Sequence, residues 1–136
     1  MNTIGKVSSA EALQLITQVV KEAANSGKSV VAAVAGPEGE LISFIRMDDA
    51  NAGASIIAPN KAYTAARQRK FTREVGKKMQ DENVGPAYWG DDRITGFGGG
   101  VPIVQHGKVI GGIGVSGLTS VEDEELAVAA IKAVFG

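Results

Sequence analysis

The chain has 136 residues, of which 44% are hydrophobic and 21% charged, and its formal net charge is −1. This size and composition suit one globular domain over residues 1–136, with a hydrophobic core of its own. The balanced charge gives no general attraction to nucleic acid or to a membrane, so we expect neither as a partner. The lack of cysteine excludes disulfides and thiolate chemistry. No apolar window resembles a signal peptide or a membrane span, and we therefore expect a cytoplasmic protein.

The first part of the chain predicts a helix followed by two strands. Residues 8–11 (SSAE) form a capping box, and apolar residues then recur with a 3.6-residue period up to about Asn25. Two short apolar runs follow, Ser29–Ala35 and Leu41–Arg46. Only the turn residues 36–39 (GPEG) separate these runs, so the two strands are predicted to be antiparallel.

Two helices are predicted in the middle of the chain. One begins near Ile56, where Pro59 fits the first turn, and a shorter one runs from Thr72 to about Glu82. The first of these helices has a narrow face of small residues, which permits close packing on a sheet. That face consists of Ala58, Ala62, Ala65 and Ala66.

The C-terminal part predicts three strands and a final helix. Arg93–Phe97 is a candidate short edge strand, and the apolar runs Val101–Gln105 and Lys108–Ser116 flank a turn pair, as in a β-hairpin. The last helix covers Val121–Phe135, and acidic residues crowd its first turns, where the helix dipole favours negative charge. The predicted order is α-β-β-α-α-β-β-β-α, an α+β fold whose mainly antiparallel sheet has helices on both faces.

Residues Thr95–Gly117 hold half of the chain's 18 glycines. One face of the predicted strand Lys108–Ser116 carries almost no side chains because it contains Gly112 and Gly114, so something must pack close to its backbone. A helix, a partner chain or a flat ligand would fit, and close helix packing is favoured. The triplet Gly98–Gly100 predicts either a tight bend or a cradle of backbone N–H groups for an anion.

Four stretches carry a resemblance to a known family: residues 44–50 (FIRMDDA), 60–65 (NKAYTA), 97–104 (FGGGVPIV) and 107–117 (GKVIGGIGVSG). Together they resemble the GlcG/HbpS family, whose members include haem-binding HbpS proteins and the C-terminal domain of PduO corrinoid adenosyltransferases. The resemblance implies a profilin-like fold with a five-stranded antiparallel sheet between helix layers. It also implies a homo-oligomer, either a tetramer or an octamer.

Haem is therefore a possible cofactor, but the chain offers no clear axial ligand for its iron. Haem iron is usually held by His, Cys, Met or Tyr. The only histidine, His106, falls in the predicted hairpin turn, where a side chain usually projects into solvent. Met47, Tyr63 and Tyr88 are the other candidates, and no metal site is predicted.

The candidate site joins the second strand, the polar face of the long helix and the glycine bend. Arg46 and Lys61 are predicted to pair with an anionic ligand. The backbone N–H groups of the glycine bend would donate hydrogen bonds to the oxygens of that ligand. Lys61 is also a tentative catalytic base or Schiff-base nucleophile, and the alternative is an ion pair with Asp48 or Asp49. The predicted ligand-binding residues are Arg46, Lys61, Thr64, Phe97, Gly98, Gly99, Gly100 and Ser116. Either Asp123 or Ser116 is expected to contribute a polar group at the other end of the sheet.

Three functions remain open at this point. The first is a small-ligand-binding protein for an anionic metabolite or a tetrapyrrole such as haem. The second is a catabolic-pathway enzyme, a hydrolase or isomerase of oxo-acid intermediates, that uses Lys61. The third is a non-catalytic oligomeric accessory protein whose glycine face is only a packing surface. A basic cluster on the two middle helices is interpreted as a solvated face or a subunit contact: Arg67, Arg69, Lys70, Arg73, Lys77 and Lys78.

Overall fold

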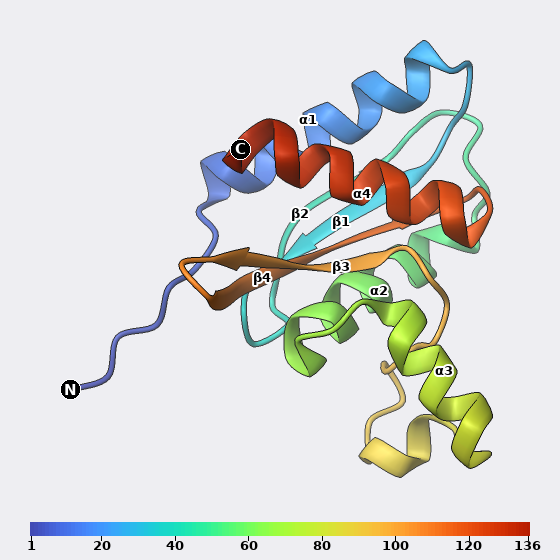
Figure 1. Ribbon diagram of the computed structural model, residues 1–136. Coiled ribbons are helices and arrows are strands. Elements are labelled where there is room, and N and C mark those ends of the chain that lie inside the picture. Colours follow the sequence, from blue (N-terminus) through green and yellow to red (C-terminus); the bar gives the residue numbers. More distant parts are fainter.

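The computed structural model describes residues 1–136 and contains one antiparallel sheet with helices on both faces (Figure 1). The strand order is β2-β1-β4-β3, so the central pair consists of one strand from each half of the chain. The elements are α1 (Ser9–Asn25), β1 (Val31–Ala35), β2 (Leu41–Arg46), α2 (Ala54–Gln68), α3 (Thr72–Glu82), the 3₁₀ turn η1 (Pro86–Trp89), β3 (Gly100–Gln105), β4 (Lys108–Ser116) and α4 (Ser120–Phe135).

The sheet has four strands, and the predicted fifth strand at Arg93–Phe97 is wrong. This segment runs alongside α2 and does not pair with a strand, because the side chain of Thr64 on α2 holds its backbone. The Thr64 hydroxyl donates to the carbonyl of Arg93 at 3.3 Å and accepts the N–H of Thr95 at 3.0 Å. The α+β class and the helices on both faces are confirmed, whereas the profilin-like label stays a prediction.

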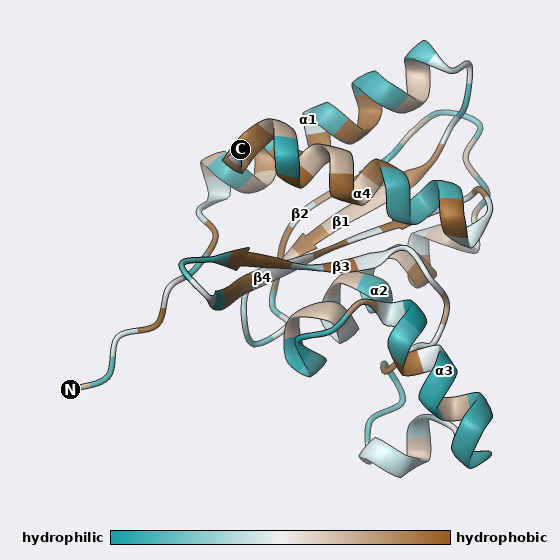
Figure 2. Ribbon diagram, viewed as in Figure 1, coloured by the Kyte–Doolittle hydropathy of each residue, from teal (hydrophilic) through white to brown (hydrophobic).

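Helices α1 and α4 cover the sheet face that carries the large side chains. Leu15 and Val19 of α1 are fully buried against Val34 of β1 and against Ile113 and Val115 of β4. Figure 2 shows apolar residues along both helices that cover this face of the sheet. The largest cluster of buried apolar residues, with 16 members, lies in this layer, and its burial contributes strongly to the hydrophobic stabilisation.

The opposite sheet face is almost bare, and α2 packs on it directly. A Cβ added to Gly114 would lie 2.2 Å from the carbonyl oxygen of Ala58, and one added to Gly112 would lie 2.5 Å from that of Ala62. Ala62 is also clustered with the alanines of β1. The predicted close helix packing is therefore confirmed, and the backbone of α2 fills the space beside the glycines.

Both long outer helices begin with the capping box that their sequences indicate. The hydroxyl of Ser8 accepts the N–H of Glu11 at the start of α1, and Thr119 and Glu122 form the same reciprocal pair at the start of α4. None of the helices combines the length and apolar character that a membrane crossing requires.

Candidate functional site

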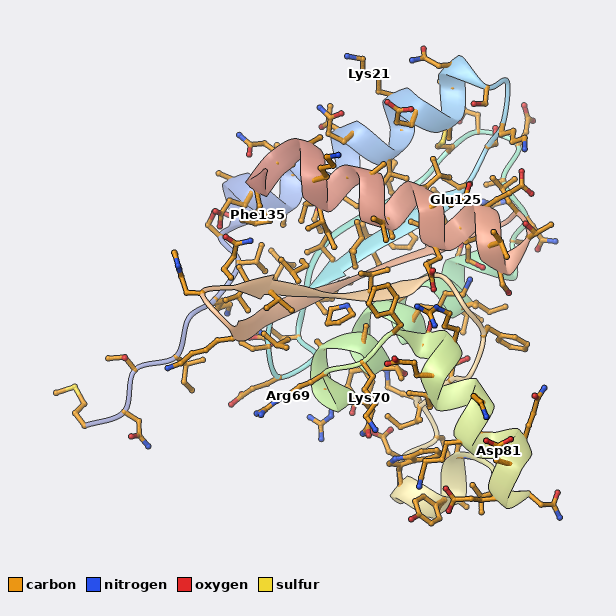
Figure 3. All side chains as sticks on the ribbon, in the orientation of Figure 1. Lys21, Arg69, Lys70, Asp81, Glu125 and Phe135 are labelled. Atoms are coloured by element: carbon orange, nitrogen blue, oxygen red, sulfur yellow. The ribbon has the colours of Figure 1, made fainter.

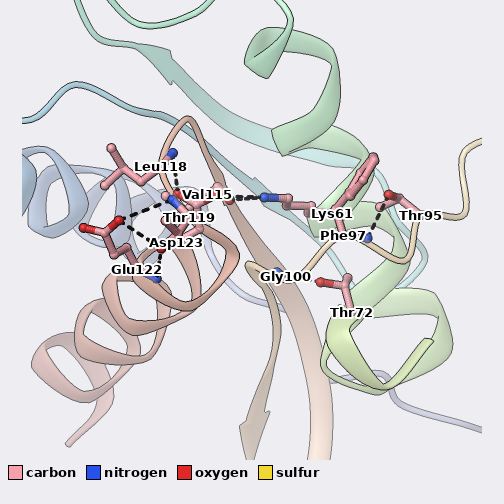
Figure 4. Close-up of polar contacts among 10 residues, drawn as sticks. All are labelled: Lys61, Thr72, Thr95, Phe97, Gly100, Val115, Leu118, Thr119, Glu122 and Asp123. Atoms are coloured by element: carbon pink, nitrogen blue, oxygen red, sulfur yellow. Dashed lines mark hydrogen bonds and ion pairs between the residues drawn. The ribbon is translucent and has the colours of Figure 1, made fainter. Parts of the chain in front are cut away.

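Helix α2 places Lys61 at the centre of a buried polar contact (Figure 4). The residue is only 2% exposed, and its Nζ donates to the carbonyl of Val115 at 2.8 Å. The same nitrogen lies 3.2 Å from Oδ2 of Asp123, which is equally buried in the first turn of α4. Because α2 and α4 cover opposite faces of the sheet, this ion pair joins the two helix layers.

Gly99 closes over the pair, and only glycine fits there. A Cβ at this position would lie 2.8 Å from Nζ of Lys61 and 2.5 Å from the carbonyl oxygen of Val115. The φ of Gly99 is +122°, a conformation that side chains rarely allow. Its carbonyl accepts the N–H of Val115 at 3.0 Å. The glycine bend is therefore fixed against the end of β4 as a cover for the charged groups.

Each charge of the pair depends on the other. Burial lowers the pKa of the Lys61 amine, and the negative charge of Asp123 opposes that shift. Burial likewise raises the pKa of the Asp123 carboxyl, and Lys61 opposes that shift. The second carboxylate oxygen, Oδ1, accepts the N–H of Leu118 at 3.1 Å. The pair is thus enclosed and hydrogen-bonded, so removal of either partner would leave the other charge buried and uncompensated.

The structure separates several residues that the sequence grouped in one site. Arg46 ends β2 and donates to the carbonyl of Ala50 through Nε and Nη2, at 3.2 and 3.0 Å. Val31 of β1 lies between Arg46 and Ser116 in the sheet register, so these two polar residues are not neighbours. The N–H of Gly100 donates to Oγ1 of Thr72 at 2.9 Å and is not free for an anion.

Phe97 and Gly98 lie instead on an open groove of about 570 Å³ between α3, residues 94–98 and the start of α4. Arg73, Lys77 and Met79 of α3 line the groove from the other side. Lys61 does not line it, but Gly98 does, next to the Gly99 cover. The volume lies within the range of small-molecule sites, roughly 300–1,000 Å³.

Helix α3 and residues 94–98 touch backbone to backbone at the base of the groove. A Cβ on Gly76 would lie 2.2 Å from the carbonyl oxygen of Gly96, so neither glycine tolerates a side chain. Thr64 fixes the same segment from α2 through the two hydrogen bonds described above. Of the predicted ligand-binding residues, Thr64 is thus placed to shape the groove without lining it.

Half of the basic cluster of the middle helices is paired with acidic groups. Nε of Arg73 lies 2.8 Å from Glu124 of α4, and Lys77 and Lys78 pair with Asp81 and Glu82 one turn further along α3. All three ion pairs lie at the surface, where charges exchange partners easily. Figure 3 shows Arg69 and Lys70 near the corner between α2 and α3.

The partner of Lys61 is the residue that the sequence analysis assigned incorrectly. The alternative of an ion pair for Lys61 is confirmed, but its partner is Asp123 and not Asp48 or Asp49. Asp123, Ala127 and Ala130 share the buried face of α4. This i, i+4, i+7 spacing is a signal that separates Asp123 from its exposed acidic neighbours. No spacing in the sequence indicates that Thr72 accepts the N–H of Gly100, or that Arg73 and Met79 line a groove.

Comparison with known proteins places the chain in a family. Residues 7–132 match the family model described as "Haem degrading protein HbpS-like", and the chain belongs to this family. It is 36% identical over 133 residues to an uncharacterized 15.0 kDa protein of Citrobacter freundii, covering 94% of this chain and 92% of that protein. It is 38% identical over 116 residues to protein GlcG of Escherichia coli K12, covering 85% of each chain.

A solved haem complex also has the same fold. The crystal structure of a PduOC–haem complex superposes with a TM-score of 0.86 and 28% identity, and the match covers 96% of each chain. The predicted GlcG/HbpS relationship is therefore confirmed, and haem binding is found within the family.

Proposed function

We propose that the chain binds a small anionic ligand of the tetrapyrrole type, such as haem, in the groove between α3 and residues 94–98. The observation that carries this proposal is the groove itself, because two of the predicted ligand-binding residues, Phe97 and Gly98, line it. The PduOC–haem complex supports haem as the ligand class. A smaller anionic metabolite remains the alternative ligand for the same groove.

The chemistry of the groove suits a flat apolar molecule with acidic groups at its edge. Phe97 is 62% exposed, an unusual position for a large aromatic ring, and it offers a surface for stacking. Arg73 and Lys77 lie on the opposite wall and are positively charged. Their surface ion pairs contribute little stability, so exchange of a protein carboxylate for a ligand carboxylate costs little.

We infer a supporting role for Lys61 in this site. Its amine is enclosed by Val115, Asp123 and the Gly99 cover, so a substrate carbonyl has no route to it in this conformation. Loss of the pair would loosen the glycine bend that continues into Gly98 at the groove. The enzyme alternative requires the bend to lift, and borohydride trapping of an imine on Lys61 with a small oxo-acid would establish it.

We further propose a cytoplasmic homo-oligomer, a tetramer or an octamer, as the resemblance implies. Exposed apolar side chains outside the groove support association between copies, among them Leu41, Phe44 and Ile56. Light scattering on the purified protein measures the assembly directly. A monomer at micromolar concentration would contradict this part of the proposal.

The groove is tested by a haem titration of two matched variants. Phe97→Glu adds one negative charge inside the groove, and Leu13→Glu adds the same charge at a residue that is 61% exposed on α1, across the sheet. We expect the wild-type Soret band to shift on binding and Phe97→Glu to weaken affinity at least about tenfold. Leu13→Glu should bind as the wild type does.

Two outcomes would contradict the groove as the binding site. One is a wild-type protein whose addition leaves the Soret band of micromolar haem unchanged. The other is an equal loss of affinity in Phe97→Glu and Leu13→Glu, which would indicate non-specific attraction of haem to the surface.

A further inference from the structure

We propose that Met79 supplies the thioether that binds the haem iron in this chain. This inference rests on the proposed haem-binding function and assigns the protein ligand that the sequence alone left open. Methionine is among the established axial ligands of haem iron. Met79 belongs to α3 and lines the groove, and it is half-buried there.

The position of the Met79 sulfur relative to Gly96 carries the proposal. The sulfur lies 2.9 Å from the point that a Cβ on Gly96 would occupy. The thioether therefore reaches from α3 to the backbone of residues 94–98, the two walls of the groove. Any side chain at residue 96 would displace it. The Met79 side chain thus connects the two walls and is also one of the residues that line the groove.

The other donor side chains of the chain are placed elsewhere or are already engaged. His106 sits in the turn between β3 and β4 and does not line the groove. The hydroxyl of Tyr63 donates to Asp91 at 2.6 Å. Met47 packs against the main core, and its sulfur accepts the N–H of Val30 at 3.4 Å. No cysteine is present.

Tyr88 is likewise outside the groove lining. Its ring packs edge-on against Trp89 at 5.0 Å, and the amine of Lys78 lies 5.1 Å from its centre. Met79 is therefore the one side chain of the usual haem-ligand types that lines the groove. The basic residues on the same wall, Arg73 and Lys77, complete the set that this ligand requires: a soft donor for the metal and cations for the carboxylates.

The test compares two conservative substitutions of methionine. Met79→Leu and Met47→Leu each replace the thioether by an apolar group of similar volume, so both variants should fold. Each protein is loaded with haem, and its absorption spectrum and reduction potential are measured. We expect the absorption spectrum and the reduction potential of the haem-loaded wild type to differ from those of Met79→Leu, because a thioether ligand raises the potential of haem iron. Met79→Leu should lower the potential, while Met47→Leu should change neither property.

The outcomes separate this assignment from the proposed function. A Met79→Leu protein that binds haem with the wild-type spectrum and potential would overturn Met79 as the ligand and leave the groove proposal intact. Loss of the wild-type spectrum in His106→Gln would overturn it in favour of the histidine. Wild-type protein that leaves the Soret band unchanged would overturn the haem proposal as a whole. Thermal melts of each variant confirm that the fold is retained.

Discussion

The two faces of the sheet achieve close packing in opposite ways. The face under α1 and α4 is lined by branched side chains such as Ile113 and Val115, which are fully buried. The face under α2 is lined by glycine and alanine, and the helix backbone comes within contact of the strand backbone. On the first face, buried apolar area stabilises the fold. On the second face, the fold is stabilised by close packing of helix backbone on strand backbone, which the missing side chains permit. The two faces should therefore tolerate opposite kinds of substitution.

The bare face also explains how a charged residue comes to be buried. A Cβ on Gly114 would lie 2.8 Å from Cβ of Lys61, so the glycine allows the stem of the lysine to lie against β4. The amine then reaches the carbonyl of Val115 and the carboxylate of Asp123. The close approach of α2 and the buried ion pair are consequences of the same missing side chains.

The largest expected effect is from breaking that ion pair. Lys61→Met should lower the free energy of unfolding by about 3–5 kcal/mol at neutral pH, because Asp123 is left buried without its partner. Lys77→Met is the matched control, since its pair with Asp81 lies at the surface and should cost less than about 1 kcal/mol. Urea denaturation of both variants measures the difference.

A double variant distinguishes a charge effect from a packing effect. Lys61→Met with Asp123→Asn removes both charges and keeps an oxygen for the N–H of Leu118. We expect it to recover more than half of the loss, because no buried charge remains. A double variant as unstable as Lys61→Met alone would mean that the packing of the lysine stem is what matters.

Neighbouring residues on β4 sharpen the comparison of the two faces. Ile113→Ala should cost about 2–5 kcal/mol by leaving a cavity under α1 and α4. Gly114→Ala should cost about 2–3 kcal/mol for the opposite reason, because its Cβ would lie 2.2 Å from the carbonyl of Ala58. Gly85→Ala, where nothing lies within 4 Å, is the control and should cost little. A harmless Gly114→Ala would refute the close packing of α2.

A further expected effect is a pH dependence of the stability of the Lys61→Met variant. Burial raises the pKa of Asp123 in the folded chain, so the folded chain holds this proton more tightly than the unfolded chain does. Without Lys61 to oppose that shift, stability should fall as the pH rises from about 4 toward neutrality, by at most about 1.4 kcal/mol per pH unit. Urea midpoints at several pH values measure this slope, and a loss relative to wild type that is the same at every pH would contradict it.

Much of the fold could be predicted because local patterns specify it. The capping box at Ser8 and the hairpin around His106 each depend on residues close in sequence. The error at Arg93–Phe97 arose because that segment is held by a distant hydroxyl on Thr64, which no local pattern reveals. The spacing of Gly112 and Gly114 predicted the bare face of β4. It also favoured the close packing of a helix on that face.

The candidate site was less predictable because its contacts span the chain. The partner of Lys61 lies 62 residues away on the other helix layer. Arg46 and Ser116 each looked like a ligand contact, yet strand order separates them. The groove depends on how α3 meets residues 94–98 through two glycines, Gly76 and Gly96, whose close approach no local sequence pattern indicates. Phe97 and Gly98 are the predicted residues that line it.

The most direct test of a closed α2 face and an open groove is to locate bound haem by nuclear magnetic resonance. Ferric haem broadens the signals of nearby amides in isotope-labelled protein. We expect broadening across residues 76–80 and 94–98, while Gly112 and Gly114 under α2 keep their signals. Broadening centred on Gly112 and Gly114, with α3 unaffected, would contradict this account of where the ligand binds.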